Sequence, residues 1–387
     1  MRRREKKDHA KAALSADRSS SIAVNSFVTR CVATGGLVVF AVASAGLSLA
    51  LLGRPDLDAP SDGHVRLLEA KTDLNGHVVA TLQNQELGLK ILTLDRCIIG
   101  AQYLQEEFQD QAAFTGFALQ EAVVFVNRSL RRVLQLGLGA ASVPNFLRSR
   151  RIQVDVVEVS ETVIDMAEKH FGFSSCRRGN TKACQQRFGR TVQGDGREFL
   201  FGRDRRYDLV ISDVFVGSNP GHLHSLEVFQ RIQQQWLWPS GVLMVNFVGF
   251  HSGHRSHISR KLARTLRHVF ATTRCFRDED PAEHLDAAAN LVCLASDQAF
   301  HFNVPTTGDF SNPAPFSSVW VMKHFQQWQA TPALCAHERI DELVCENDVL
   351  PLHRKAPSEP PSDAEPFAQR VRGRLEQTLF EYLRGRG

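Results

Sequence analysis

The chain has 387 residues, of which 43% are hydrophobic and 23% charged, and its formal net charge is +4. These fractions are those of a globular protein, and they exclude the disordered, collagen-like and low-complexity classes for most of the chain. Residues 1–30 form a basic tail with a net charge of +5, whereas residues 53–387 carry 38 basic and 39 acidic residues. A nearly neutral body does not indicate a nucleic-acid partner.

Residues 31–52 contain no charged side chain and lie between Arg30 and Arg54. A helix of about 20 apolar residues crosses a bilayer, so this segment predicts a single-pass transmembrane helix and a membrane localisation, with the organelle and the sidedness open. A cleaved targeting segment and a buried soluble helix are the alternatives. We interpret residues 53–63 as a linker.

Residues 64–110 contain four short apolar runs with alternating polar positions, separated by glycine turns: HVRLLEAK, HVVATLQN, LKILTLD and CIIGAQY. Such runs predict a small antiparallel β domain. Residues 112–129 then show apolar positions at helical spacing.

Residues 111–305 form the main predicted domain. From residue 131, strands rich in Val, Ile and Leu alternate with amphipathic helices, which predicts a doubly wound, Rossmann-like parallel α/β sheet with helices on both faces. A polar, Arg-rich stretch at 172–190 interrupts the pattern and predicts a surface loop. Residues 306–387 are a C-terminal extension with a Pro-rich linker.

The eight cysteines leave the redox compartment open. Cys97 and Cys293 lie in apolar runs and are expected to pack as small hydrophobic side chains. Cys176 and Cys184 flank a polar loop and form a candidate disulfide for an oxidising compartment. Three histidines, at positions 251, 254 and 257, lack a carboxylate or cysteine to complete a metal site, so no metal is expected.

Four features follow successive predicted strands, at the sheet edge where open α/β sheets bind ligands. Gly137 and Gly139 follow the first strand and allow close approach of the backbone to a ligand at a helix start. Tight packing of strand and helix explains these glycines equally well. Glu158 ends the next strand, where an acidic residue accepts ribose hydroxyls. The alternative for Glu158 is a solvated carboxylate.

The third and fourth strands each end on an aspartate. Asp195, followed by Gly196, presents a carboxylate suited to the exocyclic amine of adenine, although an Asx turn that caps the next helix is the simpler interpretation. Asp213 lies where the reacting part of a nucleoside ligand would be. Its alternative role is to hold the ligand or a loop.

These motifs resemble the class I S-adenosylmethionine-dependent methyltransferases, and more narrowly their spermidine-synthase-like branch, from about residue 64 to residue 300. The resemblance rests on five segments: LTLDRCIIGAQY, VEVSETVIDMAEKHF, GDGREFL, YDLVISDVF and PSGVLMVN. It implies that Asp213 is the base toward an attacking amine. It also implies a set of cofactor-lining residues: Gly137, Gly139, Glu158, Asp195 and Gly196.

The chain departs from the polyamine aminopropyltransferases at four places. Ala140 and Val216 stand where that family has acids, Gly100 stands where it has a glutamine, and Phe114-Thr115-Gly116 replaces its Tyr-His-Glu gate. A polyamine is a chain of ammonium groups, and its desolvation requires paired carboxylates. The departures therefore favour ordinary S-adenosylmethionine with another acceptor.

The sequence thus predicts a membrane-anchored S-adenosylmethionine-dependent methyltransferase whose acceptor, a protein or a small amine, is unknown. Transfer to an amine requires positioning and a base, and methyltransferases of the elongation-factor N-terminus give a precedent for a protein acceptor. His222 or His224 is a candidate gate, or else part of a helix start capped by Ser225.

Three alternatives stay open. The first is a polyamine aminopropyltransferase that uses decarboxylated S-adenosylmethionine, and the second is a non-catalytic nucleoside-binding homologue. The third, a nicotinamide-dependent dehydrogenase, is disfavoured because Ser142 occupies the third glycine position of its loop. A homodimer is left open.

Overall fold

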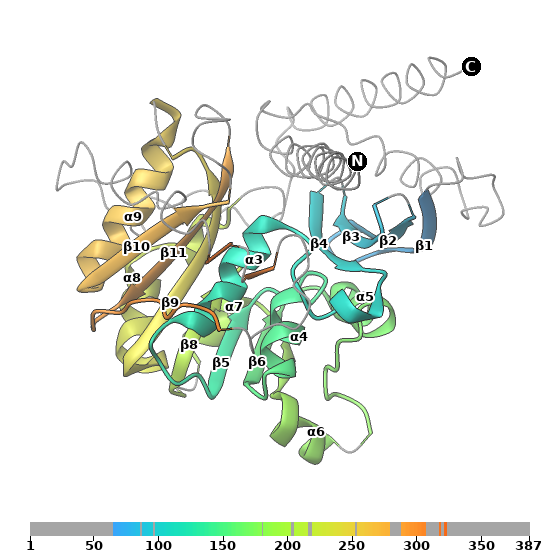
Figure 1. Ribbon diagram of the computed structural model, residues 1–387, viewed down its shortest axis with the longest axis horizontal. Helices are drawn as coiled ribbons and strands as arrows, with labels where there is room; N and C mark the ends of the chain where they lie inside the picture. Colours follow the sequence, from blue (N-terminus) through green and yellow to red (C-terminus); the bar gives the residue numbers. More distant parts are fainter. Residues whose placement is uncertain are drawn as a thin grey trace, which may run out of the picture.

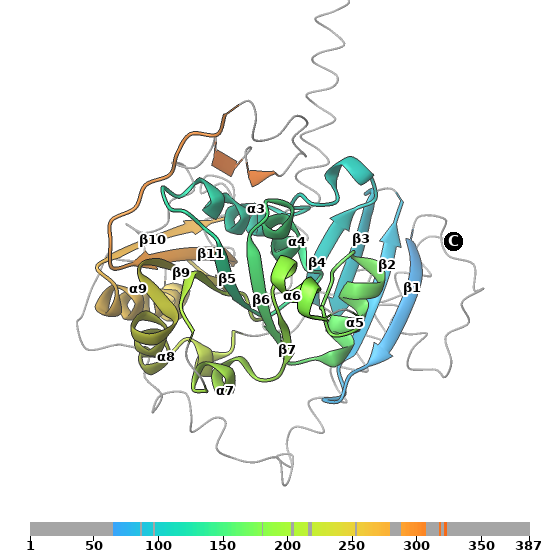
Figure 2. The same cartoon turned by 90° about the horizontal axis from the view of Figure 1, so that it is seen from below.

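The computed structural model describes residues 65–85, 87–95, 97–179, 181–202, 205–215, 219–251, 254–278, 288–306, 317–318 and 321–322. These residues build two sheets, one of four strands and one of seven, which lie side by side (Figures 1 and 2). The predicted tail, transmembrane helix and linker, and most of the C-terminal extension, lie outside the described residues.

The four-stranded sheet confirms the predicted small antiparallel sheet. Its strands pair in chain order: β1 (Val65–Thr72), β2 (Val78–Asn84), β3 (Leu89–Leu94) and β4 (Cys97–Tyr103). The helix α5 (Glu161–His170) connects this sheet to the α/β domain through polar contacts. Lys169 and His170 each lie 2.7 Å from the same carboxylate oxygen of Glu69 on β1.

The seven-stranded sheet confirms the predicted α/β fold. Its strands are β5 (Arg132–Leu136), β6 (Gln153–Glu158), β7 (Thr191–Gln193), β8 (Tyr207–Ser212), β9 (Leu237–Gly249), β10 (Thr272–Arg277) and β11 (Ala289–Ser296). The order across the sheet is β10-β11-β9-β8-β5-β6-β7, and β5 to β9 pair in parallel. From β5 the chain first adds β6 and β7 on one side and then adds β8 and β9 on the other side, so the strand order reverses between β5 and β8. Open α/β sheets bind ligands at such a reversal point.

One strand departs from the predicted parallel sheet. β11 pairs antiparallel with both β9 and β10. The segment that joins β10 to β11, residues 278–288, is shorter than the dozen or so residues that a parallel crossover needs, so the chain turns back on itself instead.

Helices cover both faces of this sheet (Figure 1). One face packs against α3 (Thr115–Glu121), α4 (Ser142–Ser149) and α5, and the other packs against α7 (Gly196–Leu200), α8 (Leu226–Arg231) and α9 (His257–Val269). Successive residues of β8 alternate between the two cores: Leu209 and Ile211 lie in the first, and Val210 lies in the second. Short single-turn helices occur at Glu106–Phe108, Ala122–Phe125, Gly221–Leu223, Ile232–Trp236 and His254–Ser256.

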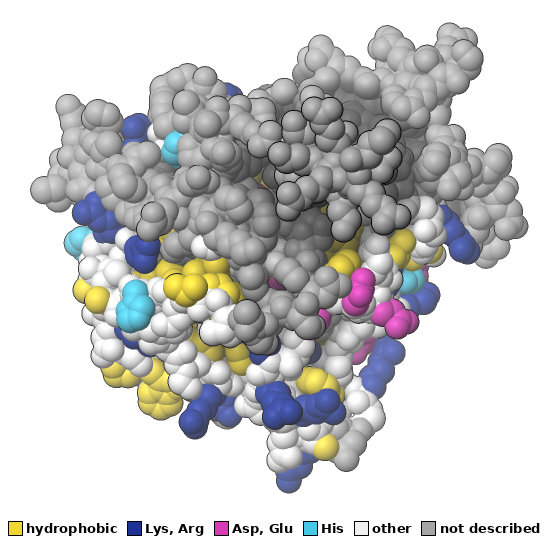
Figure 3. Space-filling view, viewed as in Figure 1, with side chains coloured by type: hydrophobic (Ala, Val, Ile, Leu, Met, Phe, Trp, Pro, Cys, Tyr) yellow, Lys and Arg dark blue, Asp and Glu magenta, His cyan; other side chains and the backbone are white. Residues whose placement is uncertain are grey.

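The polar stretch predicted as a surface loop contains a helix, α6 (Thr181–Phe188). None of the α6 side chains is buried, and exposed basic residues such as Lys182 and Arg187 belong to it. Figure 3 shows basic side chains on the lower projection, where Figure 1 places α6. Because no apolar stripe marks this helix, hydrophobic periodicity does not reveal it. A disulfide between Cys176 and Cys184, the candidate pair, closes the stretch.

A second disulfide corrects the prediction for Cys293, which does not pack as a free thiol. It is bonded to Cys275, because the antiparallel register of β10 and β11 places the two residues directly opposite each other. The two cysteines are 18 residues apart, and that register is set by tertiary pairing rather than by any local pattern.

The predicted single-pass membrane localisation is corrected. Within the part of the chain that the structure describes, no helix combines the length and the apolar character that a membrane crossing requires. The longest described helix, α9, has 13 residues, against about 20 for a bilayer. Residues 31–52, from which the prediction came, lie outside the described residues.

Candidate functional site

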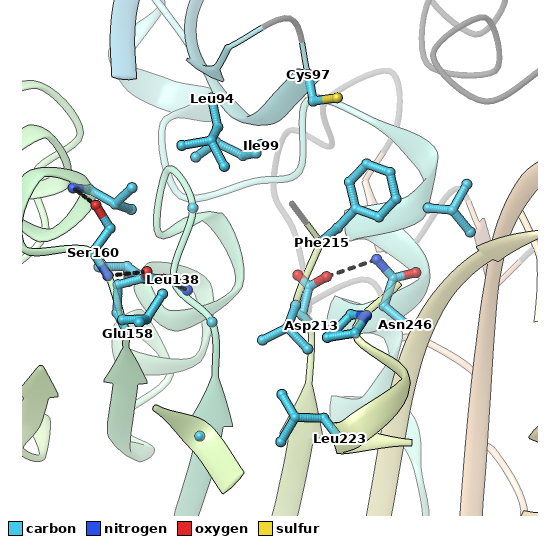
Figure 4. Close-up of a pocket in the computed structure, with 18 of the residues that line it drawn as sticks. Leu94, Cys97, Ile99, Leu138, Glu158, Ser160, Asp213, Phe215, Leu223 and Asn246 are labelled. Carbon is cyan, nitrogen blue, oxygen red and sulfur yellow. Dashed lines mark hydrogen bonds between the residues drawn. The ribbon is translucent and has the colours of Figure 1, made fainter. Parts of the chain in front are cut away.

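A cavity of about 350 Å³ opens along one edge of the seven-stranded sheet. Six neighbouring strands each contribute a polar residue or a glycine to the cavity lining. In the order of the strands from β6 to β10 across the sheet, these residues are Glu158, Gly137, Asp213, Asn246, Asn290 and Asp278. The β1–β2 turn of the small sheet closes the cavity at the Glu158 end, where it adds Asp73, Asn75 and His77 to the lining. Figure 4 shows Glu158 and Asp213 reaching into the cavity from separate strands.

The turn after β5 requires glycine at both predicted positions. Gly137 has φ +86°, and a Cβ there would lie 2.0 Å from the backbone oxygen of Asp213. Gly139 has φ +53°, and a Cβ there would lie 2.1 Å from the backbone oxygen of Ile99. Both glycines therefore allow the protein's own segments to pack closely, and both also line the cavity.

Glu158 is buried, and both of its carboxylate oxygens accept backbone hydrogen bonds. The Leu138 N–H donates to one oxygen at 2.9 Å, and the Ser160 N–H donates to the other at 2.8 Å (Figure 4). Burial raises the pKa of Glu158, and these backbone donors act against that rise. The solvated carboxylate considered from the sequence is excluded, because this side chain joins the turns after β5 and β6.

Asp195 caps a helix and faces the cavity at the same time. Its Oδ1 accepts from the Glu198 N–H at 2.9 Å, so the helix-capping interpretation is right. Its Oδ2 lies 3.8 Å from Nε2 of His222, and the nearby imidazole lowers the pKa of Asp195. Asp195, Gly196 and His222 all line the cavity.

Asp213 is buried between two side-chain amides that sequence reasoning missed. Nδ2 of Asn246 on β9 donates to Oδ1 at 2.8 Å, and Nε2 of Gln120 on α3 donates to Oδ2 at 3.2 Å (Figure 4 shows the first bond). Burial raises the pKa of Asp213, and the two amide donors act against that rise. The carboxylate is thus held in a fixed direction by one hydrogen bond from β9 and one from α3.

The orientation of these two amides follows from Asp213. An ionised carboxylate only accepts hydrogen bonds, so each amide must turn its NH₂ group toward Asp213. The other ends of the amides, Oε1 of Gln120 and Oδ1 of Asn246, are buried without a hydrogen-bond partner among the described residues. Acceptor atoms left in this way beside a carboxylate suit a ligand that brings N–H donors.

Position 140, where aminopropyltransferases carry an acid, is closed to the ligand. Ala140 is 3% exposed and packs so closely on Gly100 that a Cβ on Gly100 would lie 2.4 Å from the Ala140 Cβ. The nearby cavity wall is apolar and includes Ile98, Ile99 and Leu138. The gate position is apolar as well, since Phe114 lines the cavity beside Gly116. Val216 lies outside the described residues.

The two candidate gate histidines have different positions. His222 lines the cavity, whereas His224 is buried beside Phe229 and Phe247, and burial lowers its pKa to about 4. Ser225 caps α8, as the helix-start interpretation required. Within the described part of the chain, no group of three or more His, Cys, Asp or Glu side chains is arranged to hold a metal ion.

Two curated proteins match the chain, whereas no model of a known protein family does. An N-terminal histidine N-methyltransferase from Emericella nidulans is 25% identical over 278 residues, which are 66% of this chain and 47% of that protein. A polyamine aminopropyltransferase from Hyperthermus butylicus is 26% identical over 162 residues, which are 41% of this chain and 50% of that protein. The chain therefore spans about half the length of the curated relatives it matches.

A solved structure described as a "probable spermidine synthase" from Corynebacterium glutamicum shares the fold. Its TM-score is 0.50 at 16% sequence identity, and the match covers 72% of this chain and 97% of that one. The resemblance to the spermidine-synthase-like branch is confirmed. Both curated relatives are transferases by name, and for this chain the transferase activity, the group transferred and its acceptor are proposals.

Proposed function

We propose that this protein transfers a methyl group from S-adenosylmethionine to an amine, with Asp213 as the base. The observation that carries the proposal is the buried Asp213 carboxylate, aligned by Gln120 and Asn246 in the cavity that Glu158 also lines. The name of the Emericella nidulans relative supports an N-terminal amine of a polypeptide as the acceptor.

Residues at the β6 end of the cavity fit the nucleoside part of the cofactor. Each Glu158 oxygen uses one lone pair on a backbone N–H and keeps another, so the carboxylate is able to accept both ribose hydroxyls. Asp195 has its second oxygen on the side of His222, which lines the cavity, and this oxygen is suited to the adenine amine. When bound, S-adenosylmethionine supplies an activated methyl group.

Asp213 has the properties of a base for an amine. A nitrogen that gains a methyl group must lose a proton, and a carboxylate in hydrogen-bond range takes it. Burial raises the pKa of Asp213, which makes it a stronger base than an exposed aspartate, and the amide donors favour its ionised form. The amide oxygen of Asn246, a residue that lines the cavity, has no partner among the described residues and is available to an N–H group of the amine.

The choice of cofactor tests this function directly. We expect the full chain to bind S-adenosylmethionine at least about tenfold more tightly than its decarboxylated form, because the ammonium group of the latter needs a carboxylate where Ala140 stands. Titration calorimetry measures both affinities, and NAD serves as the negative control. Tighter binding of the decarboxylated form would favour aminopropyl transfer, and binding of neither would favour a non-catalytic homologue.

Asn246 is a positioning residue, and its replacement shifts the pH dependence. Asn246→Leu removes the donor that stabilises ionised Asp213, so the pKa of Asp213 rises and the ascending limb of the kcat–pH profile moves to higher pH. The matched control is Asn145→Leu. It removes the hydrogen bond that the Asn145 side-chain amide donates to the Phe171 carbonyl, outside the cavity. An unchanged ascending limb in the Asn246 variant would contradict the role given to Asp213.

A further inference from the structure

A second buried carboxylate lines the far end of the same cavity. Asp278, at the end of β10, is 5% exposed, and its two oxygens accept from the backbone N–H of Asn290 at 2.9 Å and from its Nδ2 at 2.6 Å. Asn290 also lines the cavity. Neither Asp278 nor Asn290 has a role in the methyl transfer proposed above.

The strand order places this carboxylate on the acceptor side of the reaction centre. Glu158 lies two strands from Asp213 in one direction, and Asp278 lies three strands away in the other. Neighbouring strands are about 4.8 Å apart, so the backbones of Asp213 and Asp278 are separated by roughly 14 Å. With the cofactor at the Glu158 end, a ligand that extends past Asp213 on its other side approaches Asp278.

The surroundings of Asp278 leave its charge incompletely compensated. Burial raises its pKa to about 6, although Asn290 donates to it and the positive charge of Arg277 acts in the opposite direction. The Arg277 guanidinium itself bonds to Nδ1 of His251 at 3.1 Å. A buried carboxylate of this kind gains free energy when a ligand brings a cationic or N–H donor group to it.

We propose that Asp278, held by Asn290, selects acceptors that carry a second nitrogen-borne hydrogen-bond donor near the reacting amine. This inference rests on the proposed methyl transfer to an amine. For a polypeptide acceptor, the donor is the side chain of the first residue: an imidazole or an ammonium group fits the carboxylate, and an apolar side chain of similar size leaves it unpaired. Asp213 then holds the reacting amine, and Asp278 determines which amine is accepted.

Matched pairs of small amines test the proposal. Histidinamide and phenylalaninamide share the reacting amine and differ in the imidazole N–H, and lysinamide and norleucinamide differ in the ammonium group. Each is titrated into the full chain saturated with S-adenosylhomocysteine, and calorimetry gives the affinities. We expect at least one nitrogen-bearing amine to bind about tenfold or more tightly than its apolar partner, and the two pairs distinguish imidazole from ammonium.

The variant Asp278→Asn keeps the size of the side chain and removes its charge. We expect the ratio of affinities within the preferred pair to fall to about threefold or less in this variant. The matched control, Asp165→Asn on α5, lies outside the cavity and should keep the wild-type ratio. Equal affinities within both pairs in the wild type, or an unchanged ratio in Asp278→Asn, would overturn the proposal. Failure to bind the cofactor would instead overturn the proposed function.

Discussion

Replacement of Asp213 by asparagine is expected to lower kcat by about a hundredfold to ten-thousandfold, the range that a general base contributes. The variant removes the group that we propose takes the proton from the acceptor amine, and it turns an NH₂ group toward one of the two amide donors that now face the carboxylate. Asp213 does not contact Glu158 or the helix cap at Asp195, so S-adenosylmethionine should still bind.

Single-turnover methyl transfer and titration calorimetry together separate these two effects. The matched control is Asp208→Asn, at the opposite end of β8, where the carboxylate accepts from the backbone N–H groups of Arg131 and Arg132. That variant should retain the wild-type kcat. If Asp213→Asn turns over at the wild-type rate, the base lies elsewhere and the proposed mechanism is wrong.

Removal of the Glu158 side chain is expected to weaken S-adenosylmethionine binding by about a hundredfold or more. Glu158→Ala loses the proposed acceptor for the ribose hydroxyls. It also removes the partner of the Leu138 and Ser160 N–H groups, each at a cost of about 1–3 kcal/mol. The glycine turn after β5 then loses the contact that fixes it to β6. Glu158→Gln should have an intermediate affinity, because its amide keeps one acceptor oxygen.

The control for Glu158 is a glutamate outside the cavity that also accepts a hydrogen bond from the backbone of a loop. Glu168 accepts from the backbone N–H of Ser175 at 2.9 Å, so Glu168→Ala also frees a loop but should spare cofactor binding. Calorimetry on the three variants gives the ranking. Wild-type affinity in Glu158→Ala would show that the nucleoside binds elsewhere.

The sequence contained enough to predict both sheets and the edge that carries the cavity. Continuous apolar strands that alternate with amphipathic helices have few other solutions, and the carboxyl ends of parallel strands meet at one edge. For this reason Gly137, Glu158, Asp195 and Asp213 line one cavity although they span most of the α/β domain. Their predicted roles toward the cofactor stay predictions that the experiments above test.

The partners of Asp213 were beyond reach of a single sequence. Gln120 lies 93 residues away in a helix. In the sequence it occupies what looks like an ordinary polar position of an amphipathic helix, whereas in the structure its side chain is fully buried. Asn246 and Asp278 offered little signal, because Asn246 lies inside the mostly apolar strand β9 and Asp278 follows the mostly polar strand β10. Their approach to the cavity depends on the position of β11 between β9 and β10, which is a tertiary pairing.

The contact between Gly100 and Ala140 has an evolutionary consequence. In the aminopropyltransferases that the chain resembles, glutamine and an acid stand at these two positions, yet here a single added carbon on Gly100 would collide with Ala140. Ala140 is 3% exposed, so an acid at position 140 would have to fit into packed surroundings. A side chain at position 100 and a larger side chain at position 140 would therefore compete for the same space, so a polyamine-type pocket requires coupled changes that separate β4 from the turn after β5.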